Sequence, residues 1–442
     1  MNRPPRAPVV LKFGGESLAA PERVIARIRL ARRGGTPVVV VVSARAGVTD
    51  LLRRVPYWNG HGETAGGLVR ELGRRHPGLS ARGVAVLRRI PALVGAIRRS
   101  HLHDAAHLDR LLSQGERLAA YWFADALEAA GVPATAVEAD RLGLVTENCY
   151  GGARILLGRS DRRVRPGLTR LLRAGRVPVV TGFFGRSVEG RVATLGRGGS
   201  DYTASAIGAI LRARRVELVK AGVAIATADP RFVPDARPVP RLSYEEAEEL
   251  AQFGAQVLHP ITIEPVRARG VELRVRSLAD NGLQTAVNHR RAVRMRAVTR
   301  LGPLRLVSVR IAGGRQRPGI IAEITRRLEA VHVNLAAVVT TEAVLGLLIE
   351  PPEAPRARRA LTPFADATGA ILGRPVPVSL VSVIGEGILG ELDRIPPRLL
   401  HRSEGLLATA RSVSIVVPDA HAVDAVRALH RAYVARRRRA SP

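Results

Sequence analysis

Residues 9–17 read VVLKFGGES, an apolar strand pattern that ends at two glycines. A helical pattern follows from Pro21 to about Arg33, and residues 36–43, TPVVVVVS, form a fully apolar strand pattern. A strand, a helix and a second buried strand in this order indicate a parallel sheet with helices on its faces. The opening of the chain therefore predicts an α/β fold.

The α/β pattern continues to about residue 299 and is then replaced by two shorter cycles. Further strands are predicted at 134–137, 177–181 and 216–219, and a helix at 202–214. After Gly302-Pro303, residues 304–372 and 376–442 each alternate strands with helices. Ile395-Pro396-Pro397 interrupts the helix expected in the second cycle, because proline breaks a helix interior. Two related small units in tandem favour an effector-binding module over a second catalytic domain.

Length and composition point to a globular protein without a membrane segment. The chain has 442 residues, which predicts two or three domains, and its 46% hydrophobic and 24% charged residues are ordinary values. No apolar run approaches the roughly 18 residues that a membrane helix needs, and the N-terminal MNRPPRAPVV lacks the apolar region of a signal peptide. With a single cysteine, Cys149, no internal disulfide is expected. We predict a cytoplasmic protein with no membrane partner.

The net charge of +31 comes almost entirely from arginine, because lysine occurs only at Lys12 and Lys220. The arginines are spread along the chain and aromatic residues make up only 3%, so no nucleic acid partner is predicted. In such a chain, a retained lysine indicates a site that needs a compact ammonium where a planar guanidinium does not fit.

A first motif suited to phosphate chemistry is KFGGES, which starts at Lys12. Gly14 and Gly15 let backbone N–H groups approach a phosphate at the start of a helix. Lys12 would neutralise charge on a transferring phosphoryl group. A simple Gly-Gly turn is the alternative interpretation.

A second motif, TLGRGGSDYTA at residues 194–204, joins a glycine-dense loop to a helix. Arg197 is suited to bind a carboxylate bidentately. Asp201 is either a helix cap or a group that orients a lysine or holds Mg²⁺. The upstream segment SQGE also has two interpretations. Either Ser113 caps a helix and Glu116 completes a capping box, or Glu116 is an anionic ligand for a substrate ammonium.

Seven segments occur in the order and at the spacing found in aspartokinases, and the resemblance covers nearly the whole chain. They are KFGGES, SARAGVTD, SQGE, VTGFFG, TLGRGGSDYTA, ATADPRFVPDAR and LSYEEAEELAQFGAQVLHPITI. Single short motifs are weak, but seven ordered matches are specific. The resemblance implies a three-layer α/β amino acid kinase domain with a mainly parallel central sheet over 1–299. Two α+β ferredoxin-like ACT domains over 304–372 and 376–442 would follow it.

The resemblance also implies a reaction, in which ATP phosphorylates the β-carboxylate of L-aspartate to give 4-phospho-L-aspartate, with Mg²⁺. A carboxylate is already a nucleophile, so positioning and cationic screening would carry the catalysis. By similarity, Arg197 takes a substrate carboxylate, Glu116 takes the ammonium, and Asp201 positions Lys12 and the metal-bound phosphates. The implied catalytic residues are Lys12 and Asp201, the substrate-binding residues are Ser17, Thr49, Glu116, Phe183, Arg197 and Ser200, and the nucleotide-binding residues are Gly14, Gly15, Lys220, Arg231 and Gln256.

The chain departs from the family mainly on the nucleotide side of the implied site. Glu16 stands where most relatives have threonine, and Gln256 stands where they have lysine. The Thr-Asp pair of the family segment WTDVDGxYTADPR is replaced by Lys220-Ala221, whereas Arg231 is kept.

Two explanations fit these departures. Either the nucleotide site has decayed and the chain is a catalytically impaired regulatory relative, or Lys220 supplies the cation that Gln256 no longer provides. A solvent-facing Lys220 at a strand end is the plain alternative to compensation. Because Lys12, Arg197 and Asp201 all persist, we favour an active enzyme. A kinase for a related acidic amino acid in specialised metabolism is a further alternative.

The two C-terminal units resemble paired ACT domains, which in this family bind amino acid effectors at interfaces between units and subunits. The implied effector-binding residues are Gln316, Pro318, Gly319, Ile320 and Asn334. We expect lysine or threonine as the effector and a homodimer formed through these domains. Dimerisation without an effector is the alternative.

Overall fold

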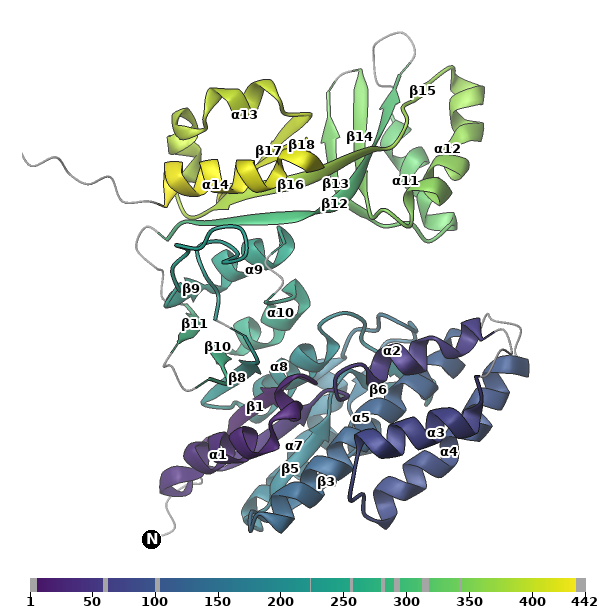
Figure 1. Ribbon diagram of the computed structural model, residues 1–442, viewed down its shortest axis with the longest axis vertical. Coiled ribbons are helices and arrows are strands. Elements are labelled where there is room, and N and C mark those ends of the chain that lie inside the picture. Colours follow the sequence, from purple (N-terminus) through teal and green to yellow (C-terminus); the bar gives the residue numbers. More distant parts are fainter. Residues whose placement is uncertain are drawn as a thin grey trace, which may run out of the picture. The chain divides into compact units, whose positions relative to one another are not determined.

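The first strand pattern of the sequence becomes β1, a central strand of an eight-stranded sheet (Figure 1). The computed structural model describes residues 6–58, 63–99, 104–222, 224–254, 257–279, 283–289, 295–311, 318–341 and 343–434. The chain divides into two compact units. Unit 1 comprises Met1–Ile225, Pro238–Ala247 and Val257–Arg291, and unit 2 comprises Ala226–Arg237, Glu248–Gln256 and Ala292–Pro442.

The large sheet of unit 1 has the strand order β3-β5-β2-β1-β8-β10-β11-β9. The first six strands in this order are parallel to their neighbours, β11 is antiparallel to β10, and β9 is parallel to β11. Strands β1, β2 and β5 are buried along their whole length, as expected where helices cover both faces of a parallel sheet. The strands are β1 (Val9–Phe13), β2 (Val38–Val42), β3 (Ala134–Val137), β5 (Val177–Thr181), β8 (Arg215–Lys220), β9 (Arg241–Ser243), β10 (Glu272–Ser277) and β11 (Gln284–Asn288).

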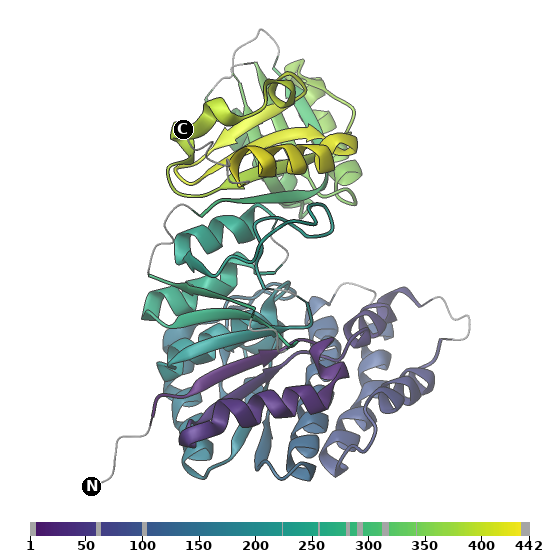
Figure 2. The ribbon, with the colours of Figure 1, turned by 60° about the vertical axis from the view of Figure 1, so that its left-hand side comes forward.

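Helices on the two faces of this sheet complete three layers. On one face, α1 and α5 pack against alternate side chains of β1 and β2, which face one side of the sheet because side chains alternate along a strand. On the other face, α8 packs against β1, β2 and β8, with α7 and α10 beside it. Figure 2 shows β1 in purple side by side with teal strands of the sheet. These helices are α1 (Pro21–Arg32), α5 (Ala105–Ala129), α7 (Leu157–Arg173), α8 (Gly199–Leu211) and α10 (Pro260–Arg269).

Smaller elements of unit 1 surround this core. A three-stranded sheet has the order β4-β6-β7, and α2, α3 and α4 form a helical layer whose apolar side chains cluster with those of α5. Helix α9 (Tyr244–Gln252) is divided between the two units. The other bounds are α2 (Val48–Arg53), α3 (Ala65–Arg75), α4 (Ala81–Arg99), β4 (Val145–Thr146), α6 (Ala139–Leu142), β6 (Phe184–Ser187) and β7 (Val192–Thr194).

Unit 2 is built on one continuous sheet with the order β13-β14-β12-β16-β18-β17, and β15 pairs with β12. The two predicted cycles of strands and helices therefore share a sheet, because the long strand β12 pairs with β14 along one edge and with β16 along the other. The strands are β12 (Ala297–Arg310), β13 (Leu335–Thr340), β14 (Val344–Ile349), β15 (Ile371–Leu372), β16 (Val376–Ile384), β17 (Gly405–Ala408) and β18 (Ser412–Pro418).

The helices of unit 2 form two separate apolar clusters on this sheet. Helices α11 and α12 pack on the first cycle, and α13 and α14 pack on the second. The prediction that prolines interrupt the helix of the second cycle is confirmed, since a 3-10 helix ends at Arg394 and α13 begins at Pro397. The bounds are α11 (Ile320–Ala330), α12 (Ala354–Thr368), the 3-10 helix Ile388–Arg394, α13 (Pro397–His401) and α14 (Ala422–Tyr433).

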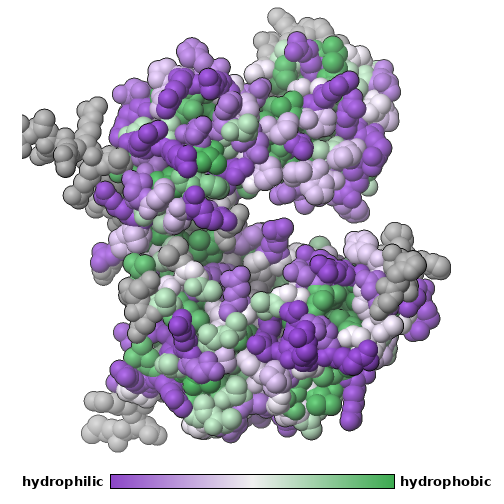
Figure 3. Space-filling view, in the orientation of Figure 1, coloured by the Kyte–Doolittle hydropathy of each residue, from purple (hydrophilic) through white to green (hydrophobic). Residues whose placement is uncertain are grey.

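The compact units cut the chain at different places from the predicted domains. A boundary at residue 299 falls inside β12, and residues 226–237 pack with the C-terminal strands and helices. Thr227 shows this attachment, because its hydroxyl lies 3.0 Å from Nε2 of His430. The division into 1–299, 304–372 and 376–442 stays a prediction about folding domains. On the face seen in Figure 3, hydrophilic side chains are scattered over both units rather than gathered in one stripe.

Candidate active site

The carboxyl ends of β1 and β8 lie side by side at one edge of the large sheet. The two strands are parallel, with Phe13 opposite Val219, so Lys12 near the end of β1 and Lys220 at the end of β8 reach the same edge. The crevice beyond the carboxyl ends of parallel strands is where α/β sheets bind ligands. Both lysines of the chain therefore lie at the position where a ligand is expected.

Asp201 joins the two lysines. Nζ of Lys12 lies 2.6 Å from Oδ1 of Asp201, and Nζ of Lys220 donates a hydrogen bond of 2.6 Å to Oδ2. Asp201 is the third residue of α8, whose N-cap is Gly198, so its carboxylate also lies in the first turn of the helix, where negative charge is favoured. The structure thus brings together the two residues predicted to be catalytic.

Burial shapes the protonation of this ion triad. Burial lowers the pKa of Lys12, while the carboxylate of Asp201 raises it and the second ammonium, of Lys220, lowers it again. Burial would raise the pKa of Asp201, but Lys12 and Lys220 outweigh it and hold that pKa below its usual value. Asp201 is therefore ionised at neutral pH.

The glycine loop after β1 packs closely against the loop after β2. A Cβ on Gly15 would lie 2.4 Å from the carbonyl oxygen of Ala44, which leaves no room for a side chain there. Gly14 lies beside Lys12, because a Cβ on Gly14 would lie 3.7 Å from Nζ of Lys12. Ser17, predicted to bind substrate, is buried and donates its hydroxyl to the carbonyl oxygen of Val219 at 3.2 Å. In this structure Ser17 holds the end of β8 against the loop.

Glu116 occupies the same neighbourhood from the opposite layer. Its Oε1 accepts a 3.0 Å hydrogen bond from the backbone N–H of Ala44, and its Oε2 has no hydrogen-bond partner among the described residues. Burial raises the pKa of Glu116 to about 8, and the charge of Lys12 opposes the rise. The carboxyl group therefore keeps its proton at neutral pH until a cation arrives to stabilise its charge.

The interpretation of Ser113 as a helix cap is wrong. Helix α5 begins eight residues earlier, with Asp104 as its N-cap, so Ser113 lies inside the helix and donates its hydroxyl to the carbonyl oxygen of Arg110. The sequence around SQGE looked like a helix start because serine and glycine are common there. Glu116 is therefore not part of a capping box.

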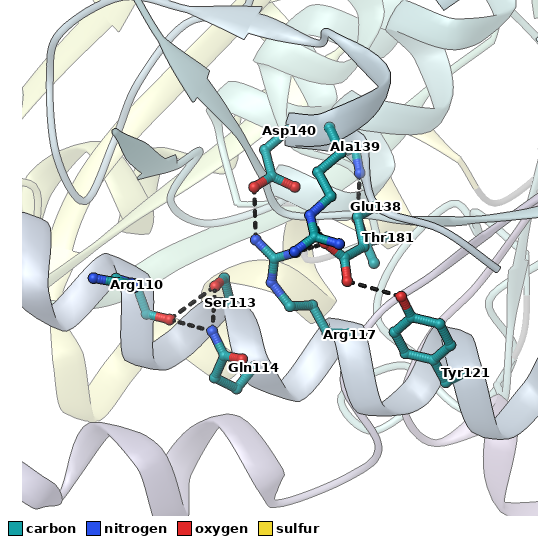
Figure 4. Close-up of polar contacts among 10 residues, drawn as sticks. Arg110, Ser113, Gln114, Arg117, Tyr121, Glu138, Ala139, Asp140 and Thr181 are labelled. Carbon is teal, nitrogen blue, oxygen red and sulfur yellow. Dashed lines mark hydrogen bonds and ion pairs between the residues drawn. The ribbon is translucent and has the colours of Figure 1, made fainter. Parts of the chain in front are cut away.

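A buried network fixes the turn of α5 that carries Glu116 (Figure 4). Arg117 forms ion pairs with Glu138 and, at 2.7 Å, with Oδ2 of Asp140. Tyr121, one turn further along, donates a 2.9 Å hydrogen bond to Glu138. Figure 4 shows Gln114 and Ser113 turned toward the backbone of Arg110 at the start of this turn. The contacts of Arg117 and Tyr121 hold α5 to Glu138 and Asp140 directly after Glu116.

The other predicted substrate-binding residues come from three segments: the loop before α8 with the first turn of that helix, the turn between β5 and β6, and α2. Arg197 is exposed, and Ser200 is buried against Gly182, where a Cβ would come within 2.6 Å of the Cβ of Ser200. Phe183 adopts a left-handed φ of 73°, and its N–H donates to Oγ1 of Thr203 on α8. Thr49 is half-buried at the start of α2.

His259 was not predicted as a site residue, although it lies within the quoted segment QVLHPITI. It is the N-cap residue of α10 and packs against Gly198, where a Cβ would come within 2.6 Å of the Cβ of His259. Burial lowers the pKa of His259, the guanidinium of Arg197 lowers it further, and Asp201 raises it. His259 therefore lies close enough to Arg197 and Asp201 for the charges of both to act on it.

Asp109 was also missed, because a single acidic residue in a helical pattern carries no sequence signal. Its carboxylate accepts hydrogen bonds from N–H and hydroxyl of Thr194, both at 2.7 Å, and from N–H of Gly151 at 2.9 Å. Burial raises the pKa of Asp109, and these hydrogen bonds oppose the rise. Asp109 anchors the first residue of the 194–204 motif to α5.

The remaining predicted residues belong to unit 2 or lie outside the described part of the chain. Arg231 belongs to unit 2, where its guanidinium pairs with Asp229 at 2.6 Å. Gln256 and Gln316 lie outside the described residues.

Four of the predicted effector residues lie in the described part of the chain, and they fall at the two ends of α11. Pro318, Gly319 and Ile320 lie at the start of α11, and Asn334 follows its end, where its N–H donates to Glu353 at 3.2 Å. A helix of 11 residues separates the two sets by roughly 16 Å at 1.5 Å per residue. A 380 Å³ cavity lined by Asn334 and six other described residues includes none of Pro318, Gly319 and Ile320.

Membrane crossing finds no support in the described residues, since none of their helices has the length and apolar character to span a bilayer.

Comparison with known proteins places this geometry among related chains. Residues 7–277 match the family model described as the amino acid kinase family. An aspartokinase of Thermus thermophilus is 29% identical over 445 residues, which span 96% of this chain and 98% of the relative. The aspartokinase of Corynebacterium glutamicum is 32% identical over 339 residues, which span 74% of this chain and 69% of the relative.

A solved structure shares the fold across almost the whole chain. The crystal structure of E. coli aspartokinase III in complex with aspartate and ADP has a TM-score of 0.81 and 24% sequence identity, and the match covers 96% of this chain and 99% of that chain. The fold of this chain, with a large mainly parallel sheet in unit 1 and a second sheet in unit 2, is therefore a known one.

Proposed function

The chain belongs to the aspartokinases of the amino acid kinase family, and from this premise we propose that it transfers the γ-phosphoryl group of ATP to the β-carboxylate of L-aspartate. One observation carries the proposal. The ion pair of Lys12 with Asp201 and the buried carboxyl group of Glu116 lie together at the carboxyl edge of the parallel sheet. This edge offers cations for a polyphosphate and a separate anionic group for an amine.

The aspartate molecule is proposed to bind between α5 and the loop before α8. Arg197 takes a substrate carboxylate through its planar guanidinium, and Glu116 takes the ammonium and loses its proton as it does so. Ser200, Thr49 and Phe183 shape the pocket. Ser17 supports the pocket indirectly, through its hydrogen bond to the end of β8.

The nucleotide is proposed to place its phosphates over the glycine loop. Gly14 and Gly15 expose backbone N–H groups, and Lys12 and Lys220 supply positive charge. That Arg231 and Gln256 contact the nucleotide stays a prediction from the sequence. No group of three or more His, Cys, Asp or Glu that could hold a metal lies among the described residues. We propose that Mg²⁺ would be held by the phosphate oxygens and Asp201, and that it would screen the phosphate charge.

The transfer step needs no general base. An oxygen of the β-carboxylate attacks the γ-phosphorus, the bond from that phosphorus to the β–γ bridging oxygen breaks, and ADP leaves with the electron pair. The products are the acyl phosphate and ADP, and no proton changes place. The barrier is the approach of one anion to another, which cations and exact positioning lower.

The activity is tested by trapping the acyl phosphate. Purified protein with ATP, Mg²⁺, L-aspartate and hydroxylamine should produce the aspartyl hydroxamate at a rate proportional to enzyme. A panel of acidic amino acids in the same assay tests the alternative acceptor. A protein that binds aspartate but forms no hydroxamate with any amino acid of the panel would instead be the catalytically impaired regulatory relative.

Regulation is proposed to reside in unit 2. Pro318, Gly319 and Ile320 of one chain and Asn334 of a second chain would form one effector site in a homodimer, since the two sets lie at opposite ends of α11 within a chain. Lysine and threonine are the effectors to try. Sedimentation with and without each amino acid, together with inhibition curves, tests both the dimer and the effector.

A further inference from the structure

The two lysines of the chain meet at a single carboxylate. The chain has 69 basic residues, and lysine occurs only at positions 12 and 220, which are 208 residues apart in sequence. Both ammonium groups nevertheless lie 2.6 Å from oxygen atoms of Asp201, one on each oxygen. A chain that uses arginine almost everywhere else has therefore placed both of its lysines at the same side chain.

Stability does not explain this choice of lysine. Elsewhere in unit 1, buried carboxylates that pair with two cations use two arginines. Glu217, with a fully buried side chain, is held by Arg27 and Arg215, the latter at 2.5 Å. Glu138 has a 4% exposed side chain and is held by Arg117 and Arg141. Two guanidinium groups are thus enough to hold a buried carboxylate in this protein.

What distinguishes lysine is a compact charge that is free to change partners. An ammonium presents three donors on a flexible stem, whereas a guanidinium is a planar fork that favours one fixed bidentate partner. The side chain of Lys220 is 26% exposed, compared with 7% for those of Lys12 and Asp201. Lys220 therefore lies at the open side of the ion triad, where an incoming anion would meet it first.

We propose that Lys220 is a second phosphate-binding cation of the active site, which Asp201 holds in place until nucleotide binds. In the ligand-free protein, Asp201 balances one of the two positive charges. When a triphosphate enters, the ammonium of Lys220 turns to its oxygens, and Asp201 keeps its contact with Lys12. This proposal rests on the proposed function, because it assumes that a nucleoside triphosphate occupies the carboxyl edge of the sheet.

A purely structural role for Lys220 makes a different prediction. If Lys220 only neutralised Asp201, its loss would lower stability and disturb Lys12, so the turnover number would fall for all substrates alike. If Lys220 binds phosphate, its loss weakens nucleotide binding above all. Comparing the loss in turnover number with the loss in nucleotide affinity therefore separates the two interpretations.

The matched control lies at the other end of the same strand. Arg215 is the first residue of β8 and pairs with buried Glu217, as Lys220 is the last residue and pairs with buried Asp201. Arg215→Met removes a cation from a buried carboxylate without approaching the carboxyl edge. It should therefore lower the melting temperature and leave nucleotide binding within twofold of wild type.

The experiment measures the dissociation constant of the Mg²⁺ complex of a non-hydrolysable ATP analogue by calorimetry on the full-length wild type, Lys220→Met and Arg215→Met proteins. We expect Lys220→Met to weaken binding at least 10-fold and Lys220→Arg to restore part of the loss. The hydroxamate assay should show a matching rise in KM for ATP, with KM for aspartate within twofold.

Equal nucleotide affinity in wild type and Lys220→Met would overturn the proposal, as would an equal loss in Arg215→Met. Because binding is measured directly, these results are independent of turnover. A wild type that binds the analogue but forms no acyl phosphate would contradict the proposed function only. If Lys220→Met does not fold, the proposal requires the analogue to shield Lys220 of the wild-type protein from acetic anhydride, as quantified by mass spectrometry, and an unshielded Lys220 would refute it.

Discussion

The carboxyl edge of the sheet in unit 1 and the two ends of α11 in unit 2 were both predicted as binding sites, and they differ in how the chain builds them. At the carboxyl edge, residues from β1, α5, α8 and β8 converge, and ion pairs hold them in buried positions. At α11, the predicted residues lie at opposite ends of the helix. The first set of residues is in contact within one chain, whereas we propose that the second set forms a site only with a second chain.

The largest effect that would test this contrast is expected from Asp201→Asn. The amide cannot balance two ammonium groups, so Lys12 and Lys220 would repel each other and lose their positions. We expect kcat to fall by roughly 10³-fold, the scale of losing a preorganised electrostatic group. The hydroxamate assay measures it.

The control for Asp201→Asn is a half-buried carboxylate of unit 2 that also has two partners. Asp419 accepts hydrogen bonds from Arg300 at 2.7 Å and from Ser379 at 2.6 Å, so Asp419→Asn also removes a charge from a paired carboxylate. It should lower the melting temperature without the loss in kcat. Equal losses in the two variants would mean that general stability, and not the carboxyl edge, accounts for the effect.

A second prediction concerns pH and Glu116. The pKa of Glu116 is about 8 in the folded protein, compared with the ordinary value of 4.5 that applies to the unfolded chain. Between these two pH values the native state therefore holds a proton that the unfolded state has lost. Stability attributable to Glu116 therefore falls as pH rises from about 4.5 to about 8. Glu116→Gln cannot titrate, and at pH 8 it should be more stable than wild type by roughly 1–3 kcal/mol.

Chemical denaturation of the ligand-free proteins at pH 4.5 and pH 8 measures this difference, which should vanish at the lower pH. The same variant should raise KM for aspartate about 100-fold, because the amide cannot balance an ammonium. Calorimetry of aspartate binding to wild type at pH 7 in two buffers of different ionisation enthalpy should reveal proton release. Binding without proton release would show that Glu116 is not the ammonium ligand.

Two glycines give the remaining contrast between the regions, and Gly15→Ala is the larger effect. The new Cβ would lie 2.4 Å from the carbonyl oxygen of Ala44, so the two loops at the carboxyl edge must separate. We expect a loss of roughly 2 kcal/mol of stability, together with a higher KM for ATP. Denaturant titration and the kinetic assay measure the two effects, and an unchanged variant would refute the close packing of the loops.

Gly319→Ala should have the smallest effect. Gly319 caps α11 with a left-handed φ of 83°, and a Cβ there would meet nothing within 4 Å. Only backbone strain opposes the substitution, at about 1 kcal/mol. Thermal unfolding should show a small decrease. A loss as large as that of Gly15→Ala would indicate packing around Gly319 that a single chain does not provide.

Much of the fold followed from local patterns. The strands β1 and β2 and the helix α8 lie within a few residues of their predicted positions, because apolar runs and glycine boundaries act over short distances. The start of α5 was missed because the SQGE segment resembles a helix start, and the strand β17 was missed because short edge strands leave little signal. The attachment of residues 226–237 to unit 2 depends on packing between distant segments, which no local pattern contains.

The candidate site was predictable where chemistry restricts the residue type. The scarcity of lysine singled out Lys12 and Lys220, and the structure places both on Asp201, so Lys220 is not a solvent-facing lysine without a partner. His259 and Asp109 act through position alone, as neighbours of Arg197 and Thr194. A single histidine or aspartate in a helical pattern does not indicate such a role, so only the tertiary structure could identify His259 and Asp109.

The central claim, that both lysines and Asp201 form one phosphate-binding site, has a direct test because the chain contains only two lysines. The NMR spectrum of protein labelled with ¹³C-lysine should show the signals of two lysine side chains, and Lys220→Met assigns them by removing one signal. Titration with the Mg²⁺ complex of a non-hydrolysable ATP analogue should shift both signals with the same saturation curve. If saturating analogue left either signal unmoved, the two lysines would not share a phosphate site.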